Sequence, residues 1–168
     1  IGSISSKGLN VIDCSGKVIT SGFIDMRSHF RQPGSDYNET METGVKAAMA
    51  GGYTTVCLMS DDEMPLDSPE NIEHIAEKSA NLPISILPVG SLSVNHEGKE
   101  LCEFSQMVKK GAIAFSDNES PIRNSQFLRY ALEYSKMNNV PVINYSRDSD
   151  LSAGGVVNES ILSTKLGL

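Results

Sequence analysis

Short apolar runs alternate with longer amphipathic stretches along the chain. The apolar runs are rich in β-branched residues, which predicts strands at residues 22–30, 53–60, 84–93, 112–117 and 140–146. Strands that are apolar throughout, with no polar alternation, are typical of a parallel sheet covered on both faces. The pattern therefore predicts an α/β fold.

The amphipathic stretches between these strands predict helices. Within residues 38–52 the apolar residues recur at helical spacing, and Gly51 follows the last of them. Residues 68–82 begin with Ser68 as a helix cap and Pro69 at the first helical position. Further helices are predicted at residues 101–111 and 124–139, and in the tail at residues 158–168.

Repeated strand–helix units suit either an open doubly wound sheet or part of a (β/α)8 barrel. A complete barrel takes about 250 residues, and this chain has 168. We therefore expect about five of the eight barrel units, from the front part of a longer chain or from a fragment completed by another segment. A small hairpin around a Ser-Gly turn is also predicted at residues 10–22.

Composition narrows the possible partners and compartments. A net charge of -7 and a pI near 4.9, without any basic run, argue against nucleic acid as a partner. No apolar stretch approaches the roughly 20 residues of a membrane span. Three scattered cysteines without metal or redox spacing predict reduced thiols and a cytoplasmic location: Cys14, Cys57 and Cys102.

Polar side chains gather where the predicted strands end. They are His29, Arg31, Asp61, Asp62, Asp117, Tyr145 and Arg147. In a barrel this edge of the sheet forms the active site, so the cluster favours a functional site over ordinary surface polarity. Asp25, Arg27 and His29 lie two residues apart, so their side chains leave one face of a strand. Two imidazoles at that spacing could bind one divalent ion, but the permanently protonated guanidinium of Arg27 could not.

Four segments of the sequence occur in a recognisable order: "SGKVITSGFIDMRSHFRQPG", "ETMETGVKAAMAGGYTTVCLM", "GAIAFSD" and "LSAGGVVNES". Together they resemble segments of the dihydroorotases, cyclic amidohydrolases of the (β/α)8 metal-dependent hydrolase superfamily. The resemblance covers nearly the whole chain. It implies a partial TIM barrel over residues 21–168, preceded by the remnant of a small β domain over residues 1–20.

The resemblance also implies a zinc site and assigns its positions. The two family histidines of the first strand fall on Arg27 and His29, and the metal-bridging carboxylate falls on Asp117. The fifth-strand histidine falls on Tyr145. His29 and Asp117 are thus the residual ligand positions, whereas Arg27 and Tyr145 stand where ligands are lost. The family's catalytic aspartate is expected beyond Leu168.

Two hypotheses follow from these substitutions. In the first, Arg27 replaces the charge of the metal and pairs with buried Asp117; the alternative is that Arg27 reaches a nearby surface carboxylate. The second concerns substrate binding, which the resemblance assigns to Arg31 and to an asparagine replaced here by Asp61. A carboxylate at that position would bond to Arg31 and repel an anionic substrate.

The resulting prediction is a catalytically silent dihydroorotase-like protein of pyrimidine biosynthesis without a cofactor. By resemblance it would serve as a structural partner of aspartate transcarbamoylase and as a homo-oligomer. The alternative is an active zinc-dependent dihydroorotase that interconverts N-carbamoyl-L-aspartate and dihydroorotate, and an activity on hydantoins is a third possibility. His74 and His96 are interpreted as solvated. Ser60 and Cys57 lack a nearby base in sequence, so no nucleophilic catalysis is predicted from them.

Overall fold

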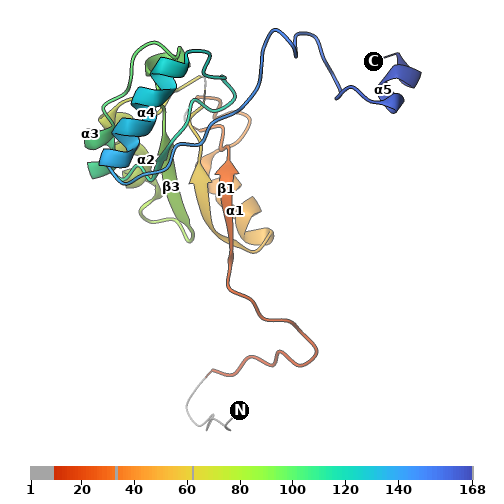
Figure 1. Ribbon diagram of the computed structural model, residues 1–168. Helices are drawn as coiled ribbons and strands as arrows, with labels where there is room; N and C mark the ends of the chain where they lie inside the picture. The colour runs from red at the N-terminus through yellow and green to blue at the C-terminus, as the bar shows by residue number, and fades with distance from the viewer. Residues whose placement is uncertain (1–9, 33, 62, 168) are drawn as a thin grey trace.

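The computed structural model describes residues 10–32, 34–61 and 63–167. A body of strands and helices lies between two extended segments (Figure 1). The N-terminal segment leads into the first strand, and the C-terminal segment runs away from the body to a last short helix. None of the described helices is long and apolar enough to cross a membrane.

Four parallel strands form one curled sheet in the order β1-β2-β3-β4. They are β1 Phe23–Ser28, β2 Tyr53–Leu58, β3 Ser85–Gly90 and β4 Ala114–Phe115. Val56 of β2 lies opposite Asp25 of β1 and Ile86 of β3, which fixes the register at the centre. Parallel order and curvature together match half of a (β/α)8 barrel, so the α/β prediction is confirmed.

Each predicted helix is present. The helices are α1 Met41–Ala50, α2 Pro69–Ser79, α3 Phe104–Lys109, α4 Ser125–Met137 and α5 Ile161–Leu166, with a 3-10 turn η1 at Val94–His96. Side-chain caps explain where four of them begin, because Thr40, Ser68, Asn124 and Ser160 each accept a backbone N–H from the first turn. Pro69 occupies the first position of α2, where its missing N–H has no helical partner to lose.

Two predicted β elements are wrong. Residues 140–146 form a single bridge, Phe115 with Val142, rather than a fifth strand. Pro141 offers no N–H to a ladder, which weakens pairing here. In the predicted hairpin the turn forms, since the Lys17 N–H donates to the Cys14 carbonyl at 3.0 Å. The described residues on either side of this turn form no β-strands, so there is no hairpin.

The predicted boundary between a small β domain and the barrel stays a prediction. Residues 1–9 lie outside the described residues, and the segment from residue 10 to residue 20 contains a turn without strands. The barrel portion itself begins with β1 at Phe23.

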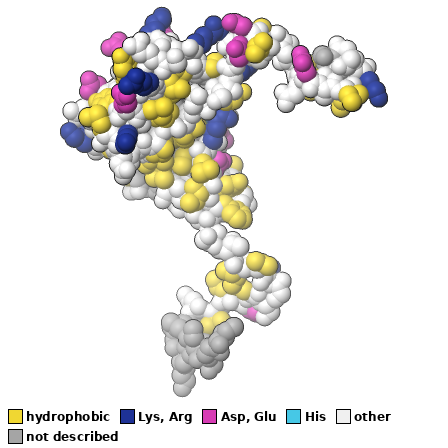
Figure 2. Space-filling model, viewed as in Figure 1, with side chains coloured by type: hydrophobic (Ala, Val, Ile, Leu, Met, Phe, Trp, Pro, Cys, Tyr) yellow, Lys and Arg dark blue, Asp and Glu magenta, His cyan; other side chains and the backbone are white. Residues whose placement is uncertain are grey.

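The exposed edge of the sheet is apolar. β1 pairs only with β2 in the described part of the chain, and its residues Phe23, Ile24 and Met26 are 55%, 62% and 74% exposed. Figure 2 shows apolar side chains gathered on the part of the body where β1 begins. In a closed (β/α)8 barrel both edges of every strand are paired, so this open edge is what a partial barrel leaves exposed.

The largest buried cluster packs between the sheet and its helices. The Phe104 ring stacks on Phe115 at 3.9 Å between centroids and on Tyr134 at 4.9 Å, which ties α3 to β4 and α4. Met107 and Phe115 are fully buried beside Gly90 of β3. This close packing leaves no room for a side chain at Gly90.

Gly90→Ala is expected to lower the free energy of unfolding by about 1–3 kcal/mol through overpacking. A methyl group there would lie 2.6 Å from Met107 Cε and 2.9 Å from Phe115 Cε1. The methionine can move, but the stacked ring cannot. Urea unfolding monitored by circular dichroism measures the change. Gly98→Ala, which meets no atom within 4 Å, is the steric control, although its positive φ of 65° adds some backbone strain. Equal stability of Gly90→Ala and the parent would contradict the packing argument.

Candidate functional site

The carboxyl ends of the strands carry the polar side chains that the sequence singles out. Arg27 and His29 come from the end of β1, Asp61 follows β2, and Asp117 follows β4. Tyr145 lies on the segment after the Val142 bridge. Parallel strands bring these five residues to one rim of the sheet, although they do not form one mutually bonded cluster.

Arg27 is bonded to the loop after β4. Its Nη2 donates to Glu119 Oε1 at 3.1 Å and to Asn118 Oδ1 at 3.3 Å. The guanidinium carbon also lies 5.9 Å from the centroid of the Tyr145 ring, within cation–π range. The predicted pairing with Asp117 is therefore wrong, and the alternative of a surface carboxylate is confirmed because the Glu119 side chain is 65% exposed.

Asp117 accepts hydrogen bonds from the loop after β3 instead of pairing with Arg27. Its Oδ1 accepts the Leu92 and Ser93 N–H groups, each at 2.8 Å, while Oδ2 accepts the Ser93 hydroxyl. The residue is only 3% exposed. Three donors compensate the buried carboxylate, which explains why no arginine is needed to neutralise it. Asp117 thereby fixes the start of the loop between β3 and α3.

His29 is the only histidine among the four ligand positions inferred from the sequence. Burial of the ring, followed by the nearby positive charge of Arg27, lowers the pKa of His29 below its ordinary value. The ring is thus neutral at pH 7 and chemically able to donate a lone pair. Arg27 nevertheless places a cation beside it.

Arg31 and Asp61 form the contact that the second hypothesis expects. Arg31 Nη1 lies 3.2 Å from Asp61 Oδ2, and their side chains are 54% and 20% exposed. An ion pair this exposed adds little to stability. It does partly neutralise Arg31. The role of either residue in binding a substrate stays a prediction.

Comparison with known proteins identifies the family. The sequence profile of the family described as Dihydro-orotase-like matches residues 16–168, which is most of the chain. This chain belongs to the dihydroorotase-like family.

Curated relatives of this dihydroorotase-like chain are much longer than it is. The protein named dihydroorotase from Elusimicrobium minutum is 40% identical over 168 residues, covering 98% of this chain and 38% of its own length. The dihydroorotase of Syntrophobacter fumaroxidans is 44% identical over 94% of this chain and 36% of its own length. That of Chlorobaculum tepidum is 40% identical over 95% and 36%. The chain thus spans little more than a third of these relatives.

The rim of this dihydroorotase-like chain does not fit the zinc ion that the family resemblance implies. His29 offers one imidazole, Arg27 offers none, and Asp117 is already bonded to three donors. Throughout residues 10–32, 34–61 and 63–167, no three His, Cys, Asp or Glu side chains come together as metal ligands. A zinc site of four protein ligands cannot be built from these residues as they lie.

Sequence reasoning missed a polar cluster of Ser60, Ser91 and His96 on the same rim. The two hydroxyl oxygens lie 2.9 Å apart, and each lies 2.9 Å from His96 Nε2. Both serines are fully buried, and the Leu66 N–H donates to Ser60 Oγ at 2.8 Å. His96 is therefore not merely solvated, and Ser60 does have a base beside it. A nucleophile with no exposed surface serves structure rather than catalysis.

The signal for this cluster was weak but present. Ser60 and Ser91 lie one or two residues beyond the ends of β2 and β3, and parallel pairing of these strands brings the two serines together. His96 reaches them because Asn95 and His96 both adopt positive φ, 53° and 57°, which turns the loop back toward the strand ends. A non-glycine residue in this region is uncommon, and two in succession require the compensating bonds described above.

Ser60→Ala is expected to lower the free energy of unfolding by about 1–3 kcal/mol. The substitution leaves the buried Leu66 N–H without its acceptor and removes one hydroxyl from His96. Thermal and urea unfolding measure the loss. Ser146→Ala, at an exposed hydroxyl, is the matched control and should change stability by less than about 0.5 kcal/mol. The same small effect for both variants would show that the cluster contributes nothing.

Proposed function

We propose that this chain is part of a catalytically silent dihydroorotase-like protein, of the non-catalytic kind with a degenerate metal site, which acts as a structural or partner-binding subunit. The observation that carries the proposal is the position of Arg27, whose guanidinium is held beside His29 by Glu119, Asn118 and the Tyr145 ring. The family resemblance would place a cation at this position, and the fixed positive charge of Arg27 supports the proposal that none is bound there.

Electrostatics opposes a metal at this position. Two unit charges 4 Å apart repel by about 4 kcal/mol at an effective dielectric constant of 20, and a divalent ion doubles that cost to about 8 kcal/mol. The exposed Glu119 offsets part of it. The remaining candidate ligands are one imidazole and one carboxylate that already accepts three hydrogen bonds. Coordination by these two groups does not offset the repulsion between Arg27 and a divalent ion. Metal-dependent hydrolysis therefore has no support from this rim.

Loss of substrate binding belongs to the same proposal. Dihydroorotate and N-carbamoyl-L-aspartate are anions, and Asp61 places a negative charge 3.2 Å from the Arg31 nitrogen that would receive them. The attraction of Arg31 for an incoming carboxylate is reduced by this neighbour. Arg31 and Asp61 would then stabilise the rim loops rather than recognise a ligand.

The partner-binding part of the proposal rests on the family resemblance alone. Aspartate transcarbamoylase and further copies of the same protein are the proposed partners, within pyrimidine biosynthesis. No cofactor is proposed. A cytoplasmic location is proposed as well, since Cys14, Cys57 and Cys102 are free thiols.

An active zinc-dependent dihydroorotase is the second candidate. The neutral state of His29 favours it, as does the name dihydroorotase on relatives about 40% identical. In this alternative His29 and Asp117 bind the ion together with ligands from outside this chain. Asp117 would have to release Leu92 or Ser93 to do so.

The two candidates are separated by assaying metal content and hydrolysis on one preparation of the full-length protein. A silent subunit carries no stoichiometric zinc, does not interconvert N-carbamoyl-L-aspartate and dihydroorotate, and is indifferent to chelators. Elemental analysis and a coupled spectrophotometric assay measure these properties. About one tightly bound zinc per chain, together with chelator-sensitive turnover, would replace the proposal by the alternative.

A further inference from the structure

Four loops extend from the carboxyl ends of the strands and form the rim. They are residues 29–32 with 34–40, residues 59–61 with 63–68, residues 91–103 and residues 116–124. The Ser35 hydroxyl donates to Glu63 Oε2, and Arg31 pairs with Asp61 at 3.2 Å. The loop after β1 is therefore bonded to the loop after β2.

The next two joints between loops are buried. Ser60 Oγ, after β2, lies 2.9 Å from Ser91 Oγ, after β3, and both serines are fully buried. Asp117, after β4, accepts the Leu92 and Ser93 N–H groups of the loop after β3. Breaking either joint would leave buried polar groups without partners, which makes these joints costly to open.

Arg27 makes the last contact, from β1 to the loop after β4. These two strands are opposite edges of the described sheet, and neighbouring strands lie about 4.8 Å apart, which puts the edges of a flat sheet about 14 Å from each other. Arg27 nevertheless reaches Glu119 Oε1 at 3.1 Å and Asn118 Oδ1 at 3.3 Å. The curl of the sheet (Figure 1) allows this contact, because side chains perpendicular to a flat sheet would not meet over that distance.

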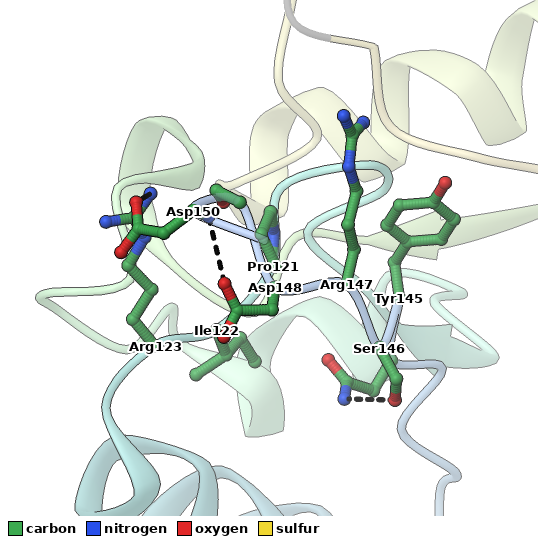
Figure 3. A pocket seen from close by; sticks show the side chains of 10 residues that line it. Pro121, Ile122, Arg123, Tyr145, Ser146, Arg147, Asp148 and Asp150 are labelled. Carbon is green, nitrogen blue, oxygen red and sulfur yellow. Dashed lines mark hydrogen bonds and ion pairs between the residues drawn. The ribbon is translucent and has the colours of Figure 1, made fainter. Parts of the chain in front are cut away.

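The loop after β4 holds the acceptors of Arg27 in place. Asn118 adopts a positive φ of 52°, which is uncommon for a residue other than glycine, and the Ser120 N–H donates to the Asp117 carbonyl at 2.9 Å. These features form a tight turn after β4. Tyr145 projects from the segment that follows the last β-bridge (Figure 3), and its ring centroid lies 5.9 Å from the Arg27 guanidinium carbon. Arg27 is thus held from two segments at once.

We infer that Arg27 closes the contacts between the four loops into a ring and thereby holds the rim in one shape without a metal ion. By family resemblance a metal ion at His29 and Asp117 would tie β1 to the loop after β4, and here the guanidinium makes that tie. Hydrogen bonds linked in this way reinforce one another. The inference rests on the proposed function, because the guanidinium and a zinc ion could not both occupy the rim beside His29.

Native-state proteolysis of the zinc-free full-length protein tests the ring. Trypsin cleaves after Arg123, in the loop after β4, and the initial cleavage rate tracks how often that loop opens. Arg27→Met removes the charge and the donors but keeps an unbranched side chain. The variant is expected to be cleaved after Arg123 at least about threefold faster, because the loop has lost its tie to β1. Cleavage after Lys78 of α2 reports opening of the whole body and should be unchanged.

Two further variants complete the test. Glu119→Gln removes the other charge of the pair at a 65% exposed side chain, so the variant is expected to fold and also to be cleaved faster after Arg123. Arg129→Met breaks an exposed ion pair of α4 and should leave this cleavage rate unchanged. Unchanged cleavage in both Arg27→Met and Glu119→Gln, or an equal acceleration after Lys78, would overturn the inference.

The ring and the proposed function fail in different ways. Stoichiometric zinc with chelator-sensitive turnover in the unaltered protein would overturn the proposed function and the ring with it. A zinc-free, inactive protein whose loop responds to neither substitution would overturn the ring alone.

Discussion

Replacing Arg27 and Tyr145 together by histidine is expected to turn a rim without a metal site into one that binds about one zinc ion per chain. Arg27→His removes the repelling cation and supplies an imidazole next to His29 on the same strand face. Tyr145→His supplies a third, since the Tyr145 ring already lies over the Arg27 guanidinium. Three neutral imidazoles that converge on one point form a common zinc-binding set.

Zinc titration followed by elemental analysis of the desalted protein measures this gain. The matched control carries Arg129→His and Tyr130→His, the same pair of changes on the exposed face of α4, and should retain no zinc. Arg27→His alone should bind more weakly than the double variant. Stoichiometric zinc in the unaltered full-length protein, or none in the double variant, would contradict the view that Arg27 and Tyr145 block the site.

Asp117→Ala is expected to cost about 3 kcal/mol or more of unfolding free energy. The substitution leaves two buried N–H groups and one hydroxyl without their acceptor, and each unsatisfied buried group costs about 1–3 kcal/mol. Some of this is recovered by water entering the loop. Asp117→Asn should cost less, because its amide oxygen still accepts from Leu92 and Ser93.

Urea denaturation of the two Asp117 variants and the parent measures the difference. Glu77→Ala, at an exposed acidic residue of α2, is the control and should change stability by less than about 0.5 kcal/mol. If Asp117 were mainly a metal ligand, the Asp117→Ala variant would instead keep its stability in the absence of zinc. Stability that falls without any dependence on added zinc is the expected pattern.

Sequence reasoning located the helices well because local chemistry determines their ends. The caps at Thr40, Ser68 and Asn124 act within one turn, so neighbouring residues are sufficient to predict them. The prediction of a fifth strand at residues 140–146 is wrong because strand formation depends on distant residues. Pairing of residues 140–146 depends on partners across the sheet, and only Val142 bridges.

The candidate site was only partly predictable. The contact of Arg31 with Asp61 joins two rim positions that the family resemblance already placed together. Asp117 and Glu119 are only two positions apart in the sequence, so the sequence does not reveal which of them pairs with Arg27. The choice depends on which carboxylate is buried and on the path of the loop after β4. The contact of Ser60 with His96 spans 36 positions and relies on positive φ at His96, so no local sequence pattern predicts it.

The loop after β2 and the loop after β3 are joined at several points. Besides the Ser60, Ser91 and His96 cluster, the Ser91 N–H donates to the Leu66 carbonyl at 2.8 Å, and the Asn95 N–H donates to Asp67 Oδ2 at 3.1 Å. Neither loop can shift without breaking bonds to the other. The two loops therefore behave as one cooperative unit, and a partner that binds either loop also immobilises the other. Backbone amides in both loops should exchange with solvent at a common rate.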